Sequence, residues 1–375
     1  MTRHARHKWL SREDKYLSAG YPLAQLLDLI PADDVALHRV LRGSGIFPDD
    51  LMNPACLISV RQVHAVVRNM RALYERHETA QRWGNRLWPG YSGALSQALA
   101  ASPDLGAFLK TLSLGRFFLC PGVSPVVRLN GDYCLLYWRH LSGSDRSVCD
   151  YLAAVFSTAL MAVLRENCEG IADRVLCLVR SRERSLADPL RVYLGCPVVT
   201  GAAADALIFP RSLLNQPWKN GSRRLFESGL SQAVSRLNEL PAATFPEAVA
   251  AFFDEQLPQS VSLQSVAGHF DLSPASVKRY LRGEGLGLQD LQDTARLRFS
   301  LESMLIDESS NEDIARTLGM GDGTNFRRAF RRWTGQYPGE LRERLRGVTL
   351  PRTERSRSDH TGSELLPGAL PEYGR

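Results

Sequence analysis

The sequence predicts an α+β domain followed by an all-α domain, in which two helix-turn-helix units are joined by a long helix. Between residues 15 and 240, strand-like runs and turn signals alternate with helical runs. From residue 247 to 346 only helical periodicity remains, and one pattern of short helix, turn and second helix occurs twice. A chain of 375 residues with 44% hydrophobic side chains is long enough to bury two cores.

The first part of the chain shows helical patterns. Apolar residues between Val35 and Leu41 suit one short amphipathic helix. Ser59 is suited to cap a second helix, whose apolar positions run from residue 63 to 73. Residues 93–114 indicate a pair of helices that is broken at Ser102-Pro103, because proline cannot continue a helix.

The middle of the chain predicts β-structure. Residues 126–138 predict a hairpin, because Asn130-Gly131 is a favoured two-residue turn between strand-like runs. Further strands are expected at 175–179, 191–194 and 198–199, with helices at 150–164 and 225–240. We therefore expect one mixed α+β domain over residues 15–240 and a linker at 241–246, where Pro241 and Pro246 mark a boundary.

The first helix-turn-helix copy covers residues 263–285. Val266-Ala267 places a small side chain where a second helix must cross closely, and Asp271 occupies the turn position. Ser273 is suited to N-cap the second helix, with Pro274 at its first position. That helix has an apolar face and an opposite, mostly basic face: Val277, Tyr280 and Leu281 against Ala275, Lys278, Arg279 and Arg282.

The second copy, residues 312–335, repeats these features. Ile314-Ala315 is the apolar-small pair, and Gly319 supplies a left-handed turn. The predicted buried stripe is Phe326, Ala329, Phe330 and Trp333, and the opposite stripe is Thr324, Arg327, Arg328 and Arg331. A basic amphipathic helix is typical of a recognition helix in a DNA major groove. A single copy would equally fit an ordinary helix with solvated arginines, but the repetition favours the DNA-binding interpretation.

The two units are connected by residues 288–305, which have helical length and amphipathicity. At ~1.5 Å per residue, such a helix spans roughly 27 Å. The two recognition helices would then lie about one DNA turn apart, near 34 Å, so that both could enter the major groove from one face.

These residues resemble the AraC/XylS type of transcriptional regulator, whose DNA-binding domain carries two helix-turn-helix units joined by a long helix. The resemblance rests on residues 263–267, 272–273, 296–297 and 314–319, and on Phe326, Arg328, Phe330, Gly335 and Pro338. Met320 and Gly321 stand where the family usually has Phe and Ser, and Ser300 where it usually has Ala. A second, shorter resemblance at residues 207–210 and 213–214 relates the N-terminal region to the arabinose-binding-like sensor domain.

The resemblance implies a sequence-specific DNA-binding transcription regulator. It also implies an activator, which is the usual role in this family. Its implied partners are double-stranded DNA, RNA polymerase, an unknown small-molecule effector at the N-terminal domain, and a second copy of the chain. The DNA-binding domain would cover residues 247–346. The alternative is a ligand-independent regulator, whose N-terminal domain only dimerises or contacts a protein partner.

Candidate DNA contacts follow from side-chain chemistry. Base-edge candidates are Ser276, Lys278 and Arg279 in the first copy and Thr324, Asn325, Arg327 and Arg328 in the second. Arg can pair bidentately with guanine, and Asn with adenine. Arg282, Arg331 and Arg332 lie later on their helices and are expected to contact phosphates. Seven Arg against two Glu between residues 324 and 346 predict that the second unit is the stronger electrostatic anchor.

Composition agrees with this interpretation. The net charge of +6 permits a polyanionic partner. Seven scattered cysteines without a CxxC pair are expected to be reduced thiols of a cytoplasmic protein. Neither a secretory signal nor an uncharged apolar stretch of about 18 residues is found, so we expect no membrane segment. Residues 347–375 lose apolar periodicity and are expected to be disordered.

The sequence carries no catalytic constellation. The eight histidines show no metal-ligand spacing, and neither a phosphate loop nor a GxSxG motif occurs. Cys120-Pro121 resembles the reactive cysteine of Ada-type DNA repair proteins. Their methyl-accepting signature, however, is Pro-Cys-His-Arg, and this chain has Leu119-Cys120-Pro121-Gly122. We therefore expect a protein that is not an enzyme and holds no cofactor or metal.

Overall fold

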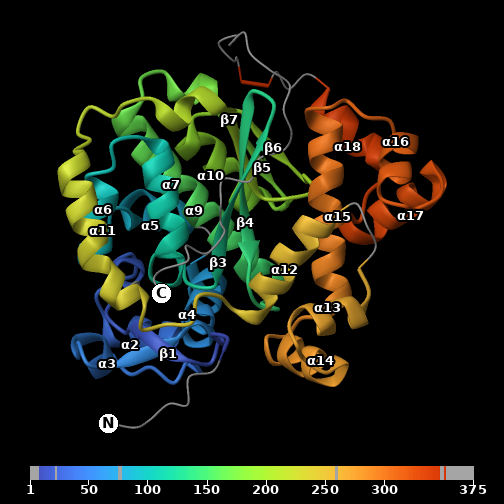
Figure 1. Ribbon diagram of the computed structural model, residues 1–375. Helices are drawn as coiled ribbons and strands as arrows, with labels where there is room; N and C mark the ends of the chain where they lie inside the picture. Colours follow the sequence, from blue (N-terminus) through green and yellow to red (C-terminus); the bar gives the residue numbers. More distant parts are fainter. Residues whose placement is uncertain (1–7, 22, 75–77, 258–260, 347–349, 352–375) are drawn as a thin grey trace.

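A five-stranded sheet lies between a layer of helices and the C-terminal helical region (Figure 1). The computed structural model describes residues 8–21, 23–74, 78–257, 261–346 and 350–351. The tail that the sequence predicts to be disordered, residues 347–375, lies outside the described residues except for Leu350 and Pro351.

The sheet has the strand order β3-β4-β7-β5-β6. Its strands are β3 (Val123–Asn130), β4 (Tyr133–His140), β5 (Leu176–Val179), β6 (Val198–Thr200) and β7 (Ala206–Pro210). Neighbouring strands are antiparallel except β5 and β6. The predicted hairpin is confirmed as β3 and β4. Its two-residue turn is Gly131-Asp132, one residue later than predicted, because Asn130 still pairs with Tyr133 and Gly131 takes the positive φ of 56°.

The predicted strand at residues 191–194 is wrong. These residues form the last turn of helix α10 (Arg184–Leu194), which connects the parallel strands β5 and β6. A parallel pair requires such a crossover, and helices commonly supply it. Leu186, Leu190 and Leu194 are buried at a spacing of four residues, whereas Val192 is 80% exposed. The β-branched and aromatic residues at 192–193 were therefore a misleading local signal.

One face of the sheet packs against helix α9 (Arg146–Asn167), which contains the helix predicted at 150–164. Trp138 of β4, Phe156 of α9 and Trp88 form an aromatic cluster there, with ring centroids 5.6–6.4 Å apart. By length and composition α9 could cross a membrane, but 89% of its most apolar window is buried inside the fold. It is therefore the central core helix of this domain.

The remaining N-terminal elements surround α9 and a small two-stranded sheet, β1 (Lys15–Ser18) with β2 (Leu57–Ser59). The helices of this part are α1 (Leu23–Leu27), α2 (Asp34–Leu41), α3 (Pro48–Met52), α4 (Val60–Tyr74), α5 (Thr79–Leu87), α6 (Ala94–Ala100), α7 (Leu105–Leu114), α8 (Arg116–Leu119) and α11 (Arg223–Leu237). Short 3₁₀ turns occupy Ile171–Arg174 and Arg211–Asn215. The structure confirms the helices that the sequence predicts in this part. They are the helices at 35–41 and 63–73, the pair broken at 102–103 and the helix near 225–240. The Ser59 hydroxyl caps α4 by accepting from the Gln62 amide at 3.3 Å.

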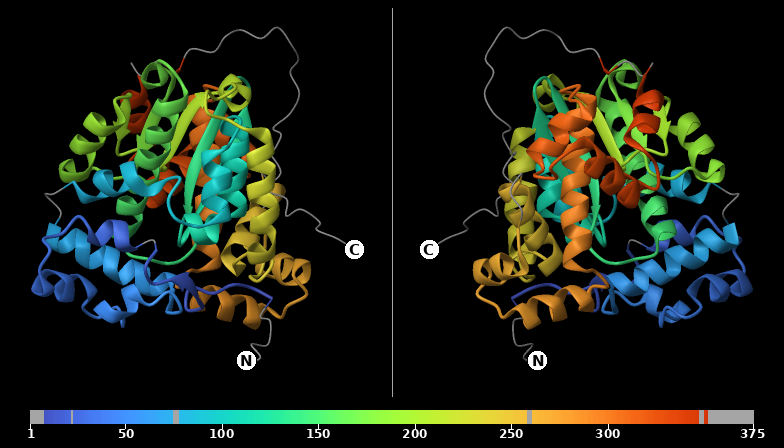
Figure 2. Two further views of the ribbon diagram at one scale, coloured as in Figure 1. Left: turned by 90° about the vertical axis from the view of Figure 1, so that its left-hand side faces the viewer. Right: turned by 90° about the vertical axis from the view of Figure 1, so that its right-hand side faces the viewer.

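The C-terminal region is all-helical. It contains α12 (Phe245–Gln256), α13 (Leu263–His269), α14 (Pro274–Gly283), α15 (Leu288–Leu305), α16 (Asn311–Thr317), α17 (Gly323–Thr334) and α18 (Pro338–Leu345). Helix α15 coincides with the connecting helix predicted at 288–305. It runs along the second face of the sheet, with the first unit at one end of the molecule and the second unit beside the sheet (Figure 2).

The buried apolar residues form separate clusters. The largest joins α9 to the first face of the sheet and the N-terminal helices. A second cluster packs the other face of the sheet, including Leu135 and Ile208, against Leu301 of α15 and against Phe326 and Phe330 of α17. A third joins α12 to α13, α14 and the first half of α15. The second unit therefore shares its core with the sheet rather than with the first unit.

Candidate nucleic-acid interface

The first helix-turn-helix unit is α13 and α14. Asp271 takes the left-handed conformation at φ 54°, as its turn position requires. The Ser273 hydroxyl caps α14 by accepting from the Ser276 amide at 3.1 Å, and Pro274 is the first helical residue. Val277 and Leu281 are buried, and the ring of Tyr280 lies at the rim of that face, 5.3 Å from the ring of Phe245.

The second unit is α16 and α17. Gly319 takes the left-handed turn at φ 66°, as predicted. Phe326 and Phe330 are fully buried, whereas Ala329 and Trp333, predicted for the same stripe, are half-buried. The N-cap of α17 is Asp322, whose carboxylate accepts from the Asn325 amide at 2.8 Å. Sequence reasoning did not single out Asp322, although Asp is one of the preferred N-cap residues directly before a helix.

The two basic faces point to solvent. On α14, Lys278, Arg279 and Arg282 are exposed and Ser276 is half-buried. The Ser276 hydroxyl accepts a 3.0 Å hydrogen bond from the Ser273 hydroxyl. On α17, Thr324, Asn325, Arg328, Arg331 and Arg332 are exposed, and Arg327 is half-buried. The fold therefore brings the candidates of each unit together on one exposed face of its second helix.

The basic candidates differ in their internal partners. Within the described part of the chain, the side chains of Lys278, Arg282 and Arg328 make no hydrogen bond or ion pair. Arg327 donates to the Thr324 hydroxyl at 2.9 Å. The side chains of Lys278, Arg282 and Arg328 can therefore turn toward a ligand without breaking a polar contact of the described chain, and Arg327 would break one.

Two arginines near the end of α17 are already engaged. Arg331 donates to the hydroxyl of Tyr337 at 2.6 Å and lies over its ring. Arg332 pairs with Asp293 of α15 at 3.3 Å. The ion pair with Asp293 joins α17 to the connecting helix α15. To contact a phosphate, as the sequence predicts, the Arg332 side chain would have to leave Asp293.

The connecting helix is anchored by buried charges. Asp254 of α12 accepts from Arg139 of β4 at 2.5 Å and from Arg298 of α15 at 2.8 Å. Burial acts to raise the pKa of Asp254, but the two guanidinium groups outweigh it and lower the pKa to about 2. Asp254 is therefore ionised at neutral pH and holds α12, α15 and the sheet together. This cluster was not foreseen, because its members come from three separated segments.

The side chain of His269 packs against an aromatic ring, and the cysteines are reduced as predicted. The His269 ring stacks on that of Phe252, with ring centroids 4.1 Å apart. The seven cysteines are all free thiols, and six of them are buried. Burial raises the pKa of Cys120 well above its ordinary value, which is unlike the lowered pKa of a reactive thiolate.

Comparison with known proteins agrees with this arrangement. Residues 35–218 match the family described as the arabinose-binding domain of AraC transcription regulator, N-terminal. Residues 266–344 match a helix-turn-helix domain family, and this range includes both α14 and α17. The chain is an AraC-type transcription regulator.

Several transcription regulators are similar to this AraC-type chain. The HTH-type transcriptional regulator VqsM of Pseudomonas aeruginosa is 29% identical over 137 residues, which are 36% of this chain and 42% of that protein. The ornithine utilization regulator of the same organism is 37% identical over 81 residues, 22% of this chain and 24% of that protein. The chain thus matches less than half the length of either relative.

A longer match involves an uncharacterized HTH-type transcriptional regulator of Mycobacterium tuberculosis. It is 24% identical over 338 residues, 86% of this chain and 96% of that protein. The crystal structure of the transcriptional regulator CdpR from Pseudomonas aeruginosa is similar with a TM-score of 0.41 and 20% identity, covering 85% of this chain and 97% of that one. The AraC-type family and the name of the Mycobacterium tuberculosis relative indicate a regulator, which is not an enzyme.

Proposed function

We propose that this AraC-type regulator is a transcription activator controlled by a small-molecule effector, which binds the N-terminal domain at residues 15–240. Residues 247–346 bind operator DNA, and residues 241–246 link the two domains. The observation that carries the proposal is the shared core between the sheet and the second unit. A ligand that changes the N-terminal domain also changes the surface on which α15 and α17 rest.

The proposed DNA contacts are those of the two exposed faces. Ser276, Lys278 and Arg279 read bases in one groove, and Thr324, Asn325, Arg327 and Arg328 read bases in the next. Arg282, Arg331 and Arg332 bind phosphates. The exposure of most of these side chains supports these roles. So does the lack, among the residues that the structure describes, of a hydrogen bond or ion pair at Lys278, Arg282 and Arg328.

The further partners are also part of the proposal. An activator in the cytoplasm contacts RNA polymerase, and a second copy of the chain doubles the number of recognition helices on one operator. Such pairing raises affinity and specificity together, since each helix-turn-helix unit contributes contacts to its own stretch of DNA.

Effector control is tested with the full-length chain. An isolated piece ending at residue 240 would expose the second face of the sheet, where Leu135 and Ile208 are now fully buried. We expect one class from a panel of sugars, amino acids and organic acids to raise the melting temperature. A ligand at a hundredfold excess over its Kd stabilises by about 2.7 kcal/mol.

The same ligand should change the affinity for DNA fragments that genome-wide mapping recovers. A panel that leaves both the melting temperature and the DNA affinity unchanged would contradict effector control. It would favour a regulator whose N-terminal domain serves only assembly.

A further inference from the structure

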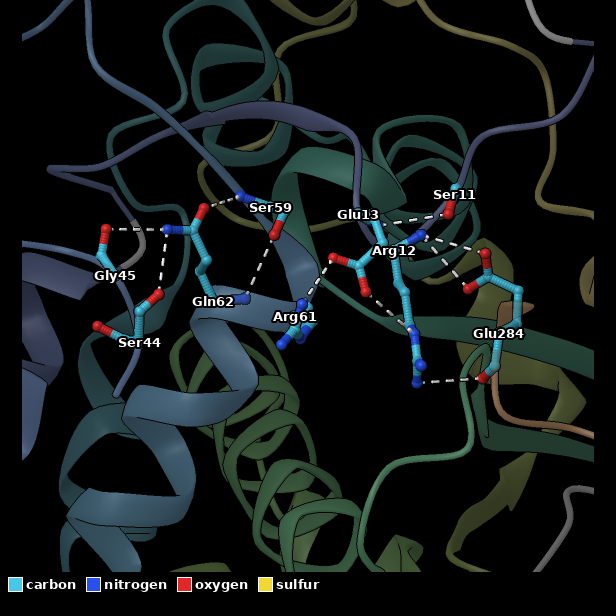
Figure 3. A network of polar contacts seen from close by, with 9 residues as sticks. All are labelled: Ser11, Arg12, Glu13, Ser44, Gly45, Ser59, Arg61, Gln62 and Glu284. Atoms are coloured by element: carbon cyan, nitrogen blue, oxygen red, sulfur yellow. Dashed lines mark hydrogen bonds and ion pairs between the residues drawn. The ribbon is translucent and has the colours of Figure 1, made fainter. Parts of the chain in front are cut away.

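The loop that follows α14 docks on the N-terminal domain. The Gly143 amide donates to the Glu284 carbonyl at 2.7 Å, and the Arg12 amide lies 3.3 Å from both carboxylate oxygens of Glu284. Glu284 is 5% exposed, and Figure 3 shows it facing Arg12 of the N-terminal segment. A Cβ at Gly143 would lie 1.9 Å from the Gly285 carbonyl oxygen, so no side chain fits between these two backbones.

The loop that follows α17 docks in the same manner. The Gln336 side chain is 2% exposed and donates to the Gly201 carbonyl at 2.6 Å. Its own oxygen accepts from Arg182 at 2.9 Å and from Arg344 at 2.7 Å. Each recognition helix is thus followed by a loop that contacts a glycine of the N-terminal domain.

The two docking glycines belong to the same end of the sheet. Gly143 follows the C-terminal end of β4, and Gly201 follows the C-terminal end of β6. Tyr137 of β4 and Leu178 of β5 both pair with Ala206, and Val179 of β5 pairs with Thr200 of β6, which places the ends of β4 and β6 at one end of the sheet with β7 and β5 between them.

A buried ion cluster links the two docking loops. Arg180, directly after β5, lies 2.8 Å from the carboxylate of Asp205 and 3.3 Å from that of Asp150. Asp150 lies near the start of α9, just after the Gly143 loop, and Asp205 lies just after the Gly201 loop. The two carboxylates are almost fully buried, so moving the start of α9 or the segment around Asp205 away from Arg180 would break a buried charge contact.

Docking leaves both recognition faces free. Lys278 and Arg279 of α14 and Thr324 and Arg328 of α17 are exposed while the loops behind them are held. Among the buried apolar residues that the structure describes, the two units belong to different clusters, and α15 runs from one to the other. Each unit is held by its own apolar packing and, separately, by a polar contact with the N-terminal domain at Gly143 or Gly201.

We propose that the N-terminal domain positions the two helix-turn-helix units relative to each other through Gly143 and Gly201, and that high affinity for two adjacent major grooves requires both docking contacts. Glu284 and Gln336 are the positioning residues on the DNA-binding side. This inference rests on the proposed DNA contacts of α14 and α17.

The test uses the full-length chain and a duplex that it selects from a random-sequence pool. Gly143→Ala separates the first docking contact, and Gln336→Ala removes the second. Gly339→Ala is the matched control, because its Cβ would meet no atom within 4 Å. We expect both docking variants to bind the selected duplex about tenfold more weakly, as for a disrupted coupling between sites, while the control binds like the parent. Half-duplexes carrying a single groove should bind all variants equally.

The outcomes separate the inference from DNA binding itself. Unchanged or tighter binding of the selected duplex by folded docking variants would overturn the positioning role, and so would an equal loss on the half-duplexes. If Gly143→Ala fails to fold, Gln336→Ala carries the same comparison. A parent chain that selects no duplex would overturn DNA binding by α14 and α17, and the inference with it.

Discussion

Asp254 and Arg298 form a two-point ion pair, with 2.8 Å between Arg298 Nη1 and Asp254 Oδ2 and 2.7 Å between Nη2 and Oδ1. Arg139 adds a third contact to the same carboxylate. The pair joins α12 to α15, and through Arg139 it joins both helices to the sheet. Because all three side chains are largely buried, their charges depend on one another rather than on water.

We expect Asp254→Asn to lower the free energy of unfolding by about 3 kcal/mol, because buried Arg139 loses its counter-charge and buried Arg298 keeps only Glu302, at 3.5 Å. Urea unfolding of the full-length chain measures this. Asp188→Asn removes an exposed ion pair with Arg191 and should cost less than about 1 kcal/mol. Equal losses in the two variants would contradict a special role for the buried pair.

The lowered pKa of Asp254 predicts that the free energy of unfolding depends on pH in the acid range. The pKa of this carboxyl is about 2 in the folded chain and 3.8 as its ordinary value, so the folded state binds its proton less readily. This contribution, about 2 kcal/mol, is present above the ordinary pKa and is lost as the pH falls through the folded pKa. The difference in unfolding free energy between the parent and Asp254→Asn should therefore shrink between about pH 4 and pH 2. A difference that stays constant over this range would rule out the lowered pKa.

Arg328→Ala should weaken binding to a cognate operator by about 1–3 kcal/mol and relax the preference at one base pair. The reason is that Arg328 is exposed on α17, without an internal partner in the described chain, where it can reach a base edge. Gel-shift titration against operator variants measures both effects. Arg316→Ala on α16, also exposed, serves as the control. Unchanged cognate binding by Arg328→Ala would refute the assignment.

Arg331→Ala should weaken binding to all DNA sequences alike and reduce the salt slope by about one, as expected for a lost phosphate contact. Arg331 donates to the Tyr337 hydroxyl, so Tyr337→Phe is needed as a companion that removes this bond and keeps the charge. Affinity measured across salt concentrations should show the smaller slope for Arg331→Ala and the parent's slope for Tyr337→Phe, which keeps the charge. A loss confined to the cognate sequence would point to base recognition instead.

Much of the local structure could be predicted from the sequence. The correct predictions concern features that depend on residues close together in the sequence. They are Ser273 as a helix cap, Gly319 as a left-handed turn residue, and Phe326 with Phe330 as a buried pair. Helix α15 has the predicted bounds because its apolar spacing and flanking glycine are local signals as well. The strand predicted at 191–194 failed for the opposite reason, since its β-rich residues lie in a crossover helix that the parallel pair of β5 and β6 requires.

By itself, the sequence determined the two helix-turn-helix units, their connecting helix and the chemistry of the exposed basic faces. These features depend on residues within about one or two helical turns of each other. Only the tertiary structure decided that the sheet completes the core of the second unit, that Asp254 receives Arg139 and Arg298, and that Gly143 and Gly201 contact the loops behind α14 and α17. Such contacts join residues 44 or more positions apart along the chain, and no local pattern in the sequence records them.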